Sequence, residues 1–346
     1  MSYPLLNDRV RVPAKELTRL VDEVGMVIVR PLEDELAEAH AYRHQHIEGH
    51  ESQAQQIRTL RRRFGIGSGI SCKYPTTHLL AAVAGTSASD YVRRHTMLPL
   101  TAAVRLHSEH VPTSADHWLS SSFHRGFNRT VDDVRICVEC LEFDDLQSAF
   151  SSYRRRHHLR GTSRCPRHGT RLHAIRDRTP FSAKPRDWLA GGQTELVPDI
   201  ESDVPDGSWM RRFTSISMAM LNADAPISTV DANQMLMERL EEAGLSTYIR
   251  RPKPLVSDLL TEKAGTRWLA DNIPGLGDRE RGDLVQWIDG FRETPYSPRS
   301  SILHAAIWAC FDWGDPWTNR ERQHRPSDQQ RSLMPAPRET LFVSAV

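Results

Sequence analysis

The sequence predicts a mainly helical protein with helix-turn-helix-like N-terminal units, a small zinc-ribbon or knuckle module, and a C-terminal helical domain. Three observations support this prediction: apolar residues recur at helical spacing, glycine-marked turns separate the N-terminal helices, and three of the five cysteines cluster within residues 137–165. The chain has 346 residues, of which 39% are hydrophobic and 26% charged, an ordinary globular composition. Disordered, collagen-like and fibrous classes are therefore excluded.

The helix-turn-helix-like units are expected in residues 28–130, after an N-terminal extension at 1–27 that carries one short amphipathic piece. The predicted helices span residues 33–47, 52–63, 78–84 and 88–95. Gly49 marks the turn in the first pair, and Gly85 marks the turn in the second. Because helix, turn and helix is also the commonest way to build an α domain, the pattern leaves open whether either unit binds DNA.

Residues 131–180 are predicted to form a zinc-binding module. They contain two pairs of metal-ligating side chains, each pair with two intervening residues. Zn²⁺ prefers four tetrahedral sulfur and nitrogen ligands, and this spacing lets one tight turn present both side chains to the same ion. The predicted ligands are Cys137, Cys140, Cys165 and His168. Four protein ligands leave no open position, so the sequence predicts a structural Zn²⁺ and not a catalytic one.

Other roles for these residues are a C-x-x-C redox pair or unrelated core thiols. A redox pair would follow a strand and open a helix, and it would leave the second pair unexplained. Cys72 and Cys310 stand alone among apolar or small residues and are expected to be buried thiols. His157 and His158 could replace His168 as a ligand, but they lie in an expected helix within an arginine run and lack a knuckle.

An arginine-rich stretch lies between the two knuckles. Residues 131–150 hold six acidic residues and one arginine, whereas 151–180 hold nine arginines and one acidic residue. The candidate contacts to nucleic acid or to a ribonucleoprotein are Arg154, Arg155, Arg156 and Arg160. A basic segment fixed beside a metal can follow phosphates. An equal alternative is a solvated helix face that the acids of residues 139–145 neutralise.

The C-terminal half is predicted to be a helical domain at 211–317, reached through a connector at 181–210 that contains proline and glycine. Its apolar faces are Phe213, Ile216 and Met220; Leu284, Ile288 and Phe291; and residues 302–311. Six of the eight tryptophans lie between 209 and 317, where they are expected to anchor the core and a domain interface. Residues 318–346 are polar and are expected to form a loosely ordered tail.

The charge composition leaves two explanations open. Of the 45 basic residues, 40 are arginine, although the formal net charge is only +1. Arginine suits phosphate by its planar fork, but codon bias in a GC-rich genome would produce the same excess. No stretch reaches the roughly 20 consecutive apolar residues of a membrane helix, and no secretion signal is apparent, so a cytoplasmic protein without a membrane partner is expected.

Three segments in the predicted zinc module resemble the TniQ family, also called TniQ/TnsD. They are I-C-V-E-C at 136–140, Y-R-R-R-H-H-L at 153–159 and C-P-R-H-G-T-R-L at 165–172. These are similar to the family's C-P-E-C, its Y-W-R-R-x-H-Q-L helix and its C-P-K-H-G-x-x-L. Upstream, R-H-T-M-L-P at 94–99 is similar to the family's H-T-L-L-P-F. The resemblance covers about residues 28–180.

The resemblance implies a non-enzymatic target-selection adaptor of a bacterial DNA transposon. Such a protein recognises attachment-site DNA or, in CRISPR-associated elements, a Cascade-like guide-RNA effector complex, and it recruits an AAA+ transposition regulator of the TnsC/TniB kind. In agreement, we find no spaced carboxylates of a transposase, no phosphate-binding glycine loop with lysine and no G-x-S-x-G turn. The alternatives are a zinc-containing DNA-binding transcription regulator and a nuclease. The sequence leaves open whether the chain forms a homodimer.

Overall fold

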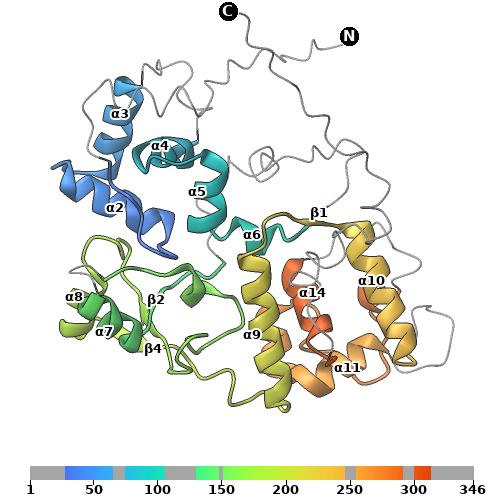
Figure 1. Ribbon diagram of the computed structural model, residues 1–346. Helices are drawn as coiled ribbons and strands as arrows, with labels where there is room; N and C mark the ends of the chain where they lie inside the picture. Colours follow the sequence, from blue (N-terminus) through green and yellow to red (C-terminus); the bar gives the residue numbers. More distant parts are fainter. Residues whose placement is uncertain are drawn as a thin grey trace, which may run out of the picture.

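A computed structural model shows a mainly helical protein, so the predicted fold class is confirmed (Figure 1). The structure describes residues 28–64, 75–105, 130–147, 151–245, 255–290 and 300–312. The expected N-terminal extension 1–27, Cys72 and the expected tail 318–346 lie outside the described residues.

Four helices form the N-terminal part as two pairs joined by turns. They are α2 (Ala37–Ile47), α3 (Gln53–Arg63), α4 (Thr76–Val83) and α5 (Ala88–His95). Ser52 and Ser87 cap α3 and α5, because each side chain accepts a hydrogen bond from the backbone N–H three residues on. Gly49 and Gly85 adopt positive φ angles of 69° and 67° in the turns, a conformation that glycine adopts without strain. Both predicted helix pairs are therefore present.

The first helix begins four residues later than the sequence predicts. Glu35 forms a β-bridge with Arg154, and the backbone N–H of Leu36 donates to the carbonyl oxygen of Tyr153 at 2.8 Å. The backbone before Ala37 is therefore extended and paired with the zinc-module segment. Helical propensity within 33–36 is overridden by this long-range pairing.

The predicted zinc module contains a small antiparallel sheet with helices around it. Its elements are β2 (Val134–Ile136), α7 (Val138–Gln147), the 3₁₀ helix η4 (Arg155–His158) and β3 (His173–Ile175), followed by α8 (Pro185–Ala190) and β4 (Thr194–Leu196). The strand order is β2-β3-β4. The segment expected as a connector at 181–210 thus supplies the third strand of this sheet.

The C-terminal helices surround a buried aromatic cluster. They are α9 (Gly207–Leu221), α10 (Thr229–Glu242), α11 (Val256–Ala264), α12 (Thr266–Asn272), α13 (Gln286–Asp289) and α14 (Ser301–Trp308). Trp209 stacks on Phe213 with ring centroids 5.3 Å apart, and the edge of Trp268 meets both rings. Cys310 is buried as expected, which raises the pKa of its thiol to about 12.

The helix predicted from Leu284 is much shorter than its apolar spacing suggests. Only α13 is helical there, and Phe291 lies outside the described residues. Ile288 is buried, but Leu284 is 45% exposed and Trp287 is 40% exposed. The apolar spacing therefore overstates the core at this position.

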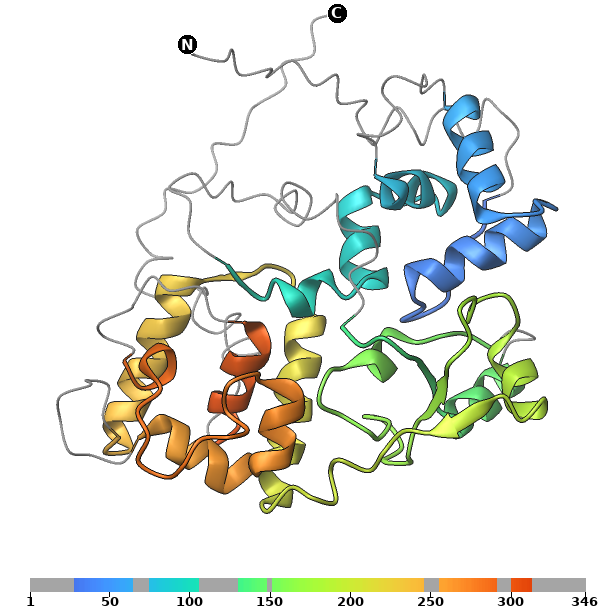
Figure 2. The same cartoon turned by 180° about the vertical axis from the view of Figure 1, so that it is seen from behind.

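Contacts join the N-terminal part and the zinc module to the C-terminal helices. After the short helix α6 (Leu98–Thr101), strand β1 (Val104–Arg105) pairs in parallel with β5 (Ile227–Ser228). The indole N–H of Trp268 donates to the carbonyl oxygen of Gly161 at 2.9 Å. One buried apolar cluster runs from Leu36 through Leu159 to the C-terminal helices. Figure 2 shows the same arrangement from behind, with the zinc module beside α9.

Candidate metal centre

The first knuckle begins where β2 ends. Cys137 follows the last residue of the strand, and its carbonyl oxygen accepts the N–H of Leu141 at 3.1 Å. Helix α7 therefore starts directly after the strand and carries Cys140 in its first turn. A redox C-x-x-C pair would have the same strand-to-helix setting, so the second knuckle has to distinguish the two roles.

The second knuckle is a tight turn over residues 165–170. The N–H of Gly169 donates to Cys165 O at 2.8 Å, and the N–H of Cys165 donates to Thr170 O at 2.8 Å. Gly169 has a φ of 73°, which an L residue rarely adopts. In the β2–β3 pairing, Ile136 lies opposite His173. This register brings the strand after the turn alongside the strand that leads into the first knuckle.

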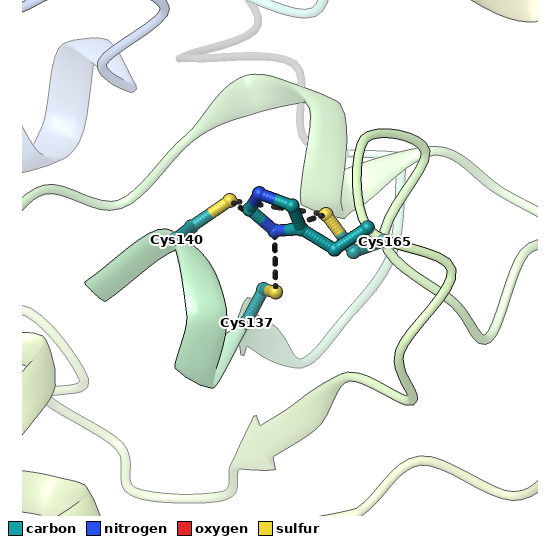
Figure 3. A group of neighbouring side chains, drawn as sticks. Cys137, Cys140 and Cys165 are labelled. Atoms are coloured by element: carbon teal, nitrogen blue, oxygen red, sulfur yellow. Dashed lines mark hydrogen bonds between the residues drawn. The ribbon is translucent and has the colours of Figure 1, made fainter. Parts of the chain in front are cut away.

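The four predicted ligands converge on one point. All of their ligand atoms lie within 4.8 Å of one another. His168 Nδ1 lies 3.5 Å from the Sγ atoms of both Cys137 and Cys140. Cys165 Sγ lies 3.8 Å from His168 Nδ1 and 3.8 Å from Cys140 Sγ. Figure 3 shows the three labelled cysteines directing their sulfur atoms toward a common centre.

These four distances are close to the edges of a tetrahedron of ligands around Zn²⁺. Bonds of about 2.3 Å to sulfur and about 2.0–2.1 Å to nitrogen place two tetrahedral sulfurs about 3.8 Å apart, and sulfur and nitrogen about 3.5–3.6 Å apart. The Cys140–Cys165 separation of 3.8 Å is far beyond the roughly 2.05 Å of a disulfide, and the cysteines of the described residues are free. The residues present therefore fit a closed four-ligand metal site.

An apolar shell encloses the sulfur atoms. Cys137, Cys140 and Cys165 are 0–2% exposed, and they pack with Leu172, Ala174 and Val197. The Thr170 hydroxyl lies 3.3 Å from Cys137 Sγ, within reach of a hydrogen bond to the sulfur. The shell thus excludes water from most of the ligand set.

His157 and His158 take different places around this centre. His157 Nε2 lies 3.7 Å from Cys165 Sγ, and burial lowers the pKa of His157 to about 4. The neutral ring can donate its N–H to the sulfur from outside the four-ligand set. His158 Nε2 instead accepts the backbone N–H of Arg135 at 3.0 Å, which leaves its Nδ1–H to donate to Arg154 O. Among the described histidines, His168 is therefore the one that joins the cysteine cluster.

The thiols of the cluster have opposite pKa shifts. Hydrogen bonds from Cys140 and Cys165 lower the pKa of Cys137, whereas the hydrogen bond to Cys137 raises the pKa of Cys140. Ionising all three crowded sulfurs requires a cation among them, which is the chemistry that a divalent metal supplies.

The predicted arginine contacts lie mostly inside the protein. Arg154 is 6% exposed, and its guanidinium forms an ion pair with Asp144. Arg155 is 4% exposed and pairs with Asp34 at 3.1 Å. Both side chains hold segments of the fold together and are not presented to solvent. The stretch is also a short 3₁₀ helix where the sequence suggested an α-helix.

Arg155 connects three parts of the chain. Its Nη1 donates to the carbonyl oxygens of Arg93 at 2.6 Å and Thr96 at 3.2 Å, and its Nη2 donates to Asn222 Oδ1 at 3.4 Å. Burial opposes the charge of Asp34, but Arg155 and its neighbour Arg156 outweigh it and lower the Asp34 pKa. Nothing in the sequence near Asp34 marks it as the partner of Arg155, because the two residues lie 121 positions apart.

Arg156 and Arg160 retain some exposure. Arg156 also pairs with Asp34, at 2.6 Å, and its side chain is 16% exposed. Arg160 is half-buried. A nucleic-acid contact at this stretch stays a prediction, and within the four arginines it depends on these two side chains.

The fold and site define a mainly helical protein in which a Cys₃His cluster is compatible with a structural metal site. The TniQ family model matches residues 26–172, a range that includes all four clustered ligands, so this part of the chain is similar to the TniQ domain. A TniQ domain indicates a role in target selection for transposition. No match was found among curated proteins. In the part of the chain that the structure describes, no helix is long and apolar enough to cross a membrane.

Proposed function

We propose that this chain is a non-enzymatic adaptor that selects the target of a DNA transposon. It binds attachment-site DNA or a CRISPR guide-RNA effector complex, and it recruits an AAA+ transposition regulator. The observation that carries the proposal is the TniQ match over residues 26–172. The closed ligand set supports a non-catalytic role for the metal, because four protein ligands leave no position for water or substrate.

The proposed metal is Zn²⁺, held by Cys137, Cys140, Cys165 and His168. A sulfur-rich tetrahedral set favours zinc over the oxygen-seeking cations. When bound, the ion supplies a cross-link between the start of α7 and the turn at 165–170. This cross-link fixes the module that contains Arg155, which in turn pairs with Asp34 of the N-terminal part.

An adaptor has to hold its two partner-binding surfaces at a fixed position relative to each other. We propose the following organisation: extension 1–27, helical part 28–130, zinc module 131–180, segment 181–210 that completes the zinc-module sheet with β4 and connects it onward, C-terminal helices 211–317 and tail 318–346. Hydrogen bonds from the Trp268 indole to Gly161 O and from the Arg155 guanidinium to Asn222 Oδ1 tie the C-terminal helices to the zinc module. A target bound on one part is thereby held at a defined position relative to a regulator bound on another.

Co-purification tests the adaptor role. The tagged full chain, loaded with zinc, is incubated with an AAA+ transposition regulator of the TnsC/TniB kind and with labelled target DNA or a Cascade-like guide-RNA effector complex. We expect one complex that contains all three components and no ATP hydrolysis or strand cleavage by this chain alone. DNA binding with no capture of the ATPase would instead favour a transcription regulator.

A further inference from the structure

Helix α7 has an exposed face made of two acidic and two apolar side chains. Glu139, Glu142, Phe143 and Leu146 are all exposed, and their i, i+3, i+4, i+7 spacing places them on one side of the helix. Phe143 is 38% exposed and Leu146 is 84% exposed, the largest value among the exposed large hydrophobic residues of the described part of the chain. We call these four residues the acidic-apolar face. Adjoining apolar side chains rimmed by polar ones indicate a place where another molecule binds.

The opposite face of α7 is fixed inside the protein. Cys140, Leu141 and Asp144 are buried, and Cys140 belongs to the Cys₃His cluster. The Asp144 carboxylate forms a buried ion pair with Arg154 and accepts the backbone N–H of Ser152 at 3.2 Å. The helix lies on the side of the zinc module away from α9 in both views (Figure 1). The acidic-apolar face is therefore held in place before a partner arrives, which reduces the entropy cost of binding.

The charges of the acidic-apolar face exclude a nucleic acid as its partner. Neither Glu139 nor Glu142 forms an ion pair with a described residue, whereas the neighbouring Asp145 pairs with Arg186 of α8. Arg167 of the second knuckle lies over the Phe143 ring, 4.4 Å from its centroid. Two carboxylates beside one guanidinium leave the face acidic. Such a surface repels the phosphates of DNA and RNA and attracts a basic protein segment.

The spacing of the four side chains defines what a partner has to present. Glu139 precedes Phe143 by four residues, and Glu142 precedes Leu146 by four, so each acid lies about 6 Å along the helix axis from an apolar group. A partner helix matches this surface when its cationic residues lie one helical turn from its aliphatic ones. A second copy of α7 does not match, because the helix contains no basic residue.

We propose that the acidic-apolar face of α7 binds a basic amphipathic helix of a partner protein. Aliphatic side chains of that helix cover Phe143 and Leu146, while its lysines or arginines pair with Glu139 and Glu142. The apolar contact supplies most of the affinity, as in other complexes in which an amphipathic helix lies along an apolar surface. The opposite charges fix the register and direction of the bound helix. The assignment rests on this surface and does not depend on the adaptor role.

A synthetic amphipathic helix tests the assignment. The probe is a fluorescently labelled peptide of leucine and lysine, about 14 residues or roughly four helical turns long, with leucine along one face. A second peptide has glutamate in place of every lysine. Each peptide is titrated with the zinc-loaded full chain, and binding is followed by fluorescence anisotropy. The lysine peptide should bind, and the glutamate peptide should not.

Two variants remove the two parts of the acidic-apolar face. Glu139→Gln/Glu142→Gln should weaken binding of the lysine peptide about twofold to thirtyfold at low salt, because it removes two exposed ion pairs. The difference should shrink at high salt, which screens exposed charges. Leu146→Ser should weaken binding about tenfold at either salt concentration, because an apolar contact is not screened.

Matched controls make the same changes at exposed positions before α13. They are Asp278→Asn/Glu280→Gln and Leu284→Ser, and both should bind the lysine peptide as the unmodified chain does. Urea midpoints close to that of the unmodified chain establish that each variant folds. No binding of the lysine peptide, similar binding of both peptides, or equal losses in the α7 and control variants would each overturn the proposal. A dimer that Leu146→Ser converts to a monomer in analytical ultracentrifugation would also overturn it, in favour of contact between two copies.

Discussion

Replacing Gly161 by alanine tests the junction between the zinc module and the C-terminal helices. Gly161 has a φ of 81°, and a Cβ atom there would meet Cζ2 of Trp268 at 2.6 Å and Oδ1 of Asn272 at 3.3 Å. The same backbone carbonyl accepts the Trp268 indole N–H, so the ring cannot retreat without losing that hydrogen bond. The substitution therefore combines backbone strain with a steric clash.

The expected cost follows from those two effects. An L residue in the left-handed region costs about 1–2 kcal/mol, and overpacking a filled core costs about 1–3 kcal/mol. Gly161→Ala should therefore lower the free energy of unfolding by about 2–5 kcal/mol. Gly244→Ala is the matched control, because Gly244 has a φ of 74° but no atom within 4 Å of the added Cβ. It should show the backbone cost alone.

Urea denaturation followed by far-ultraviolet circular dichroism gives the comparison. With zinc in excess, the Gly161→Ala midpoint should fall well below that of Gly244→Ala, while the dependence of unfolding free energy on urea stays the same. Equal midpoints for the two variants would refute the tight packing of Gly161 against Trp268.

Two further predictions concern the metal and pH. Cys140→Ser should reduce bound zinc from about one equivalent per chain to below about half. It should also lower the free energy of unfolding, because structural zinc couples metal binding to folding. A zinc-free variant that keeps its cooperative unfolding transition would contradict this. Burial lowers the pKa of His40 to about 3, well below its unfolded value, so the ring is neutral in the folded protein at neutral pH. Below pH 6.5 the unfolded chain binds a proton at His40 that the folded chain does not, so the free energy of unfolding falls by up to about 1.4 kcal/mol per pH unit between pH 6.5 and 3. In His40→Gln, the amide can still donate to Val29 O and accept from the Tyr91 hydroxyl, but it does not titrate. The urea midpoints of this variant at pH 7.5 and 5.5 should therefore differ less than those of the unmodified chain. The same difference in midpoint for both proteins would argue against a buried neutral His40.

The two pairs of metal-ligating side chains could be predicted, because the spacing that brings each pair together is visible in a short stretch of sequence. Two intervening residues bring Cys137 next to Cys140 and Cys165 next to His168, whatever the rest of the fold does. The helix caps at Ser52 and Ser87 are local in the same sense. Each of these features depends on neighbours within a few positions, which a sequence displays directly.

The role of the arginine stretch could not be predicted in this way. Arg155 and Arg156 pair with Asp34, which lies 121 and 122 positions earlier. A run of basic residues suggests an exposed surface, and only the folded chain shows that a distant carboxylate and carbonyl oxygens neutralise it.

The apolar shell of the candidate metal centre extends beyond the residues that the family model matches. The family match ends at Leu172, yet Ala174 and Val197 also pack on the cysteine cluster. A fragment cut at the family boundary would lose β3 and β4 and would open one side of three closely spaced sulfur atoms to solvent. Such thiolates would be open to oxidation and disulfide formation, which expel the metal. A redox-stable excised domain therefore has to continue at least through Val197.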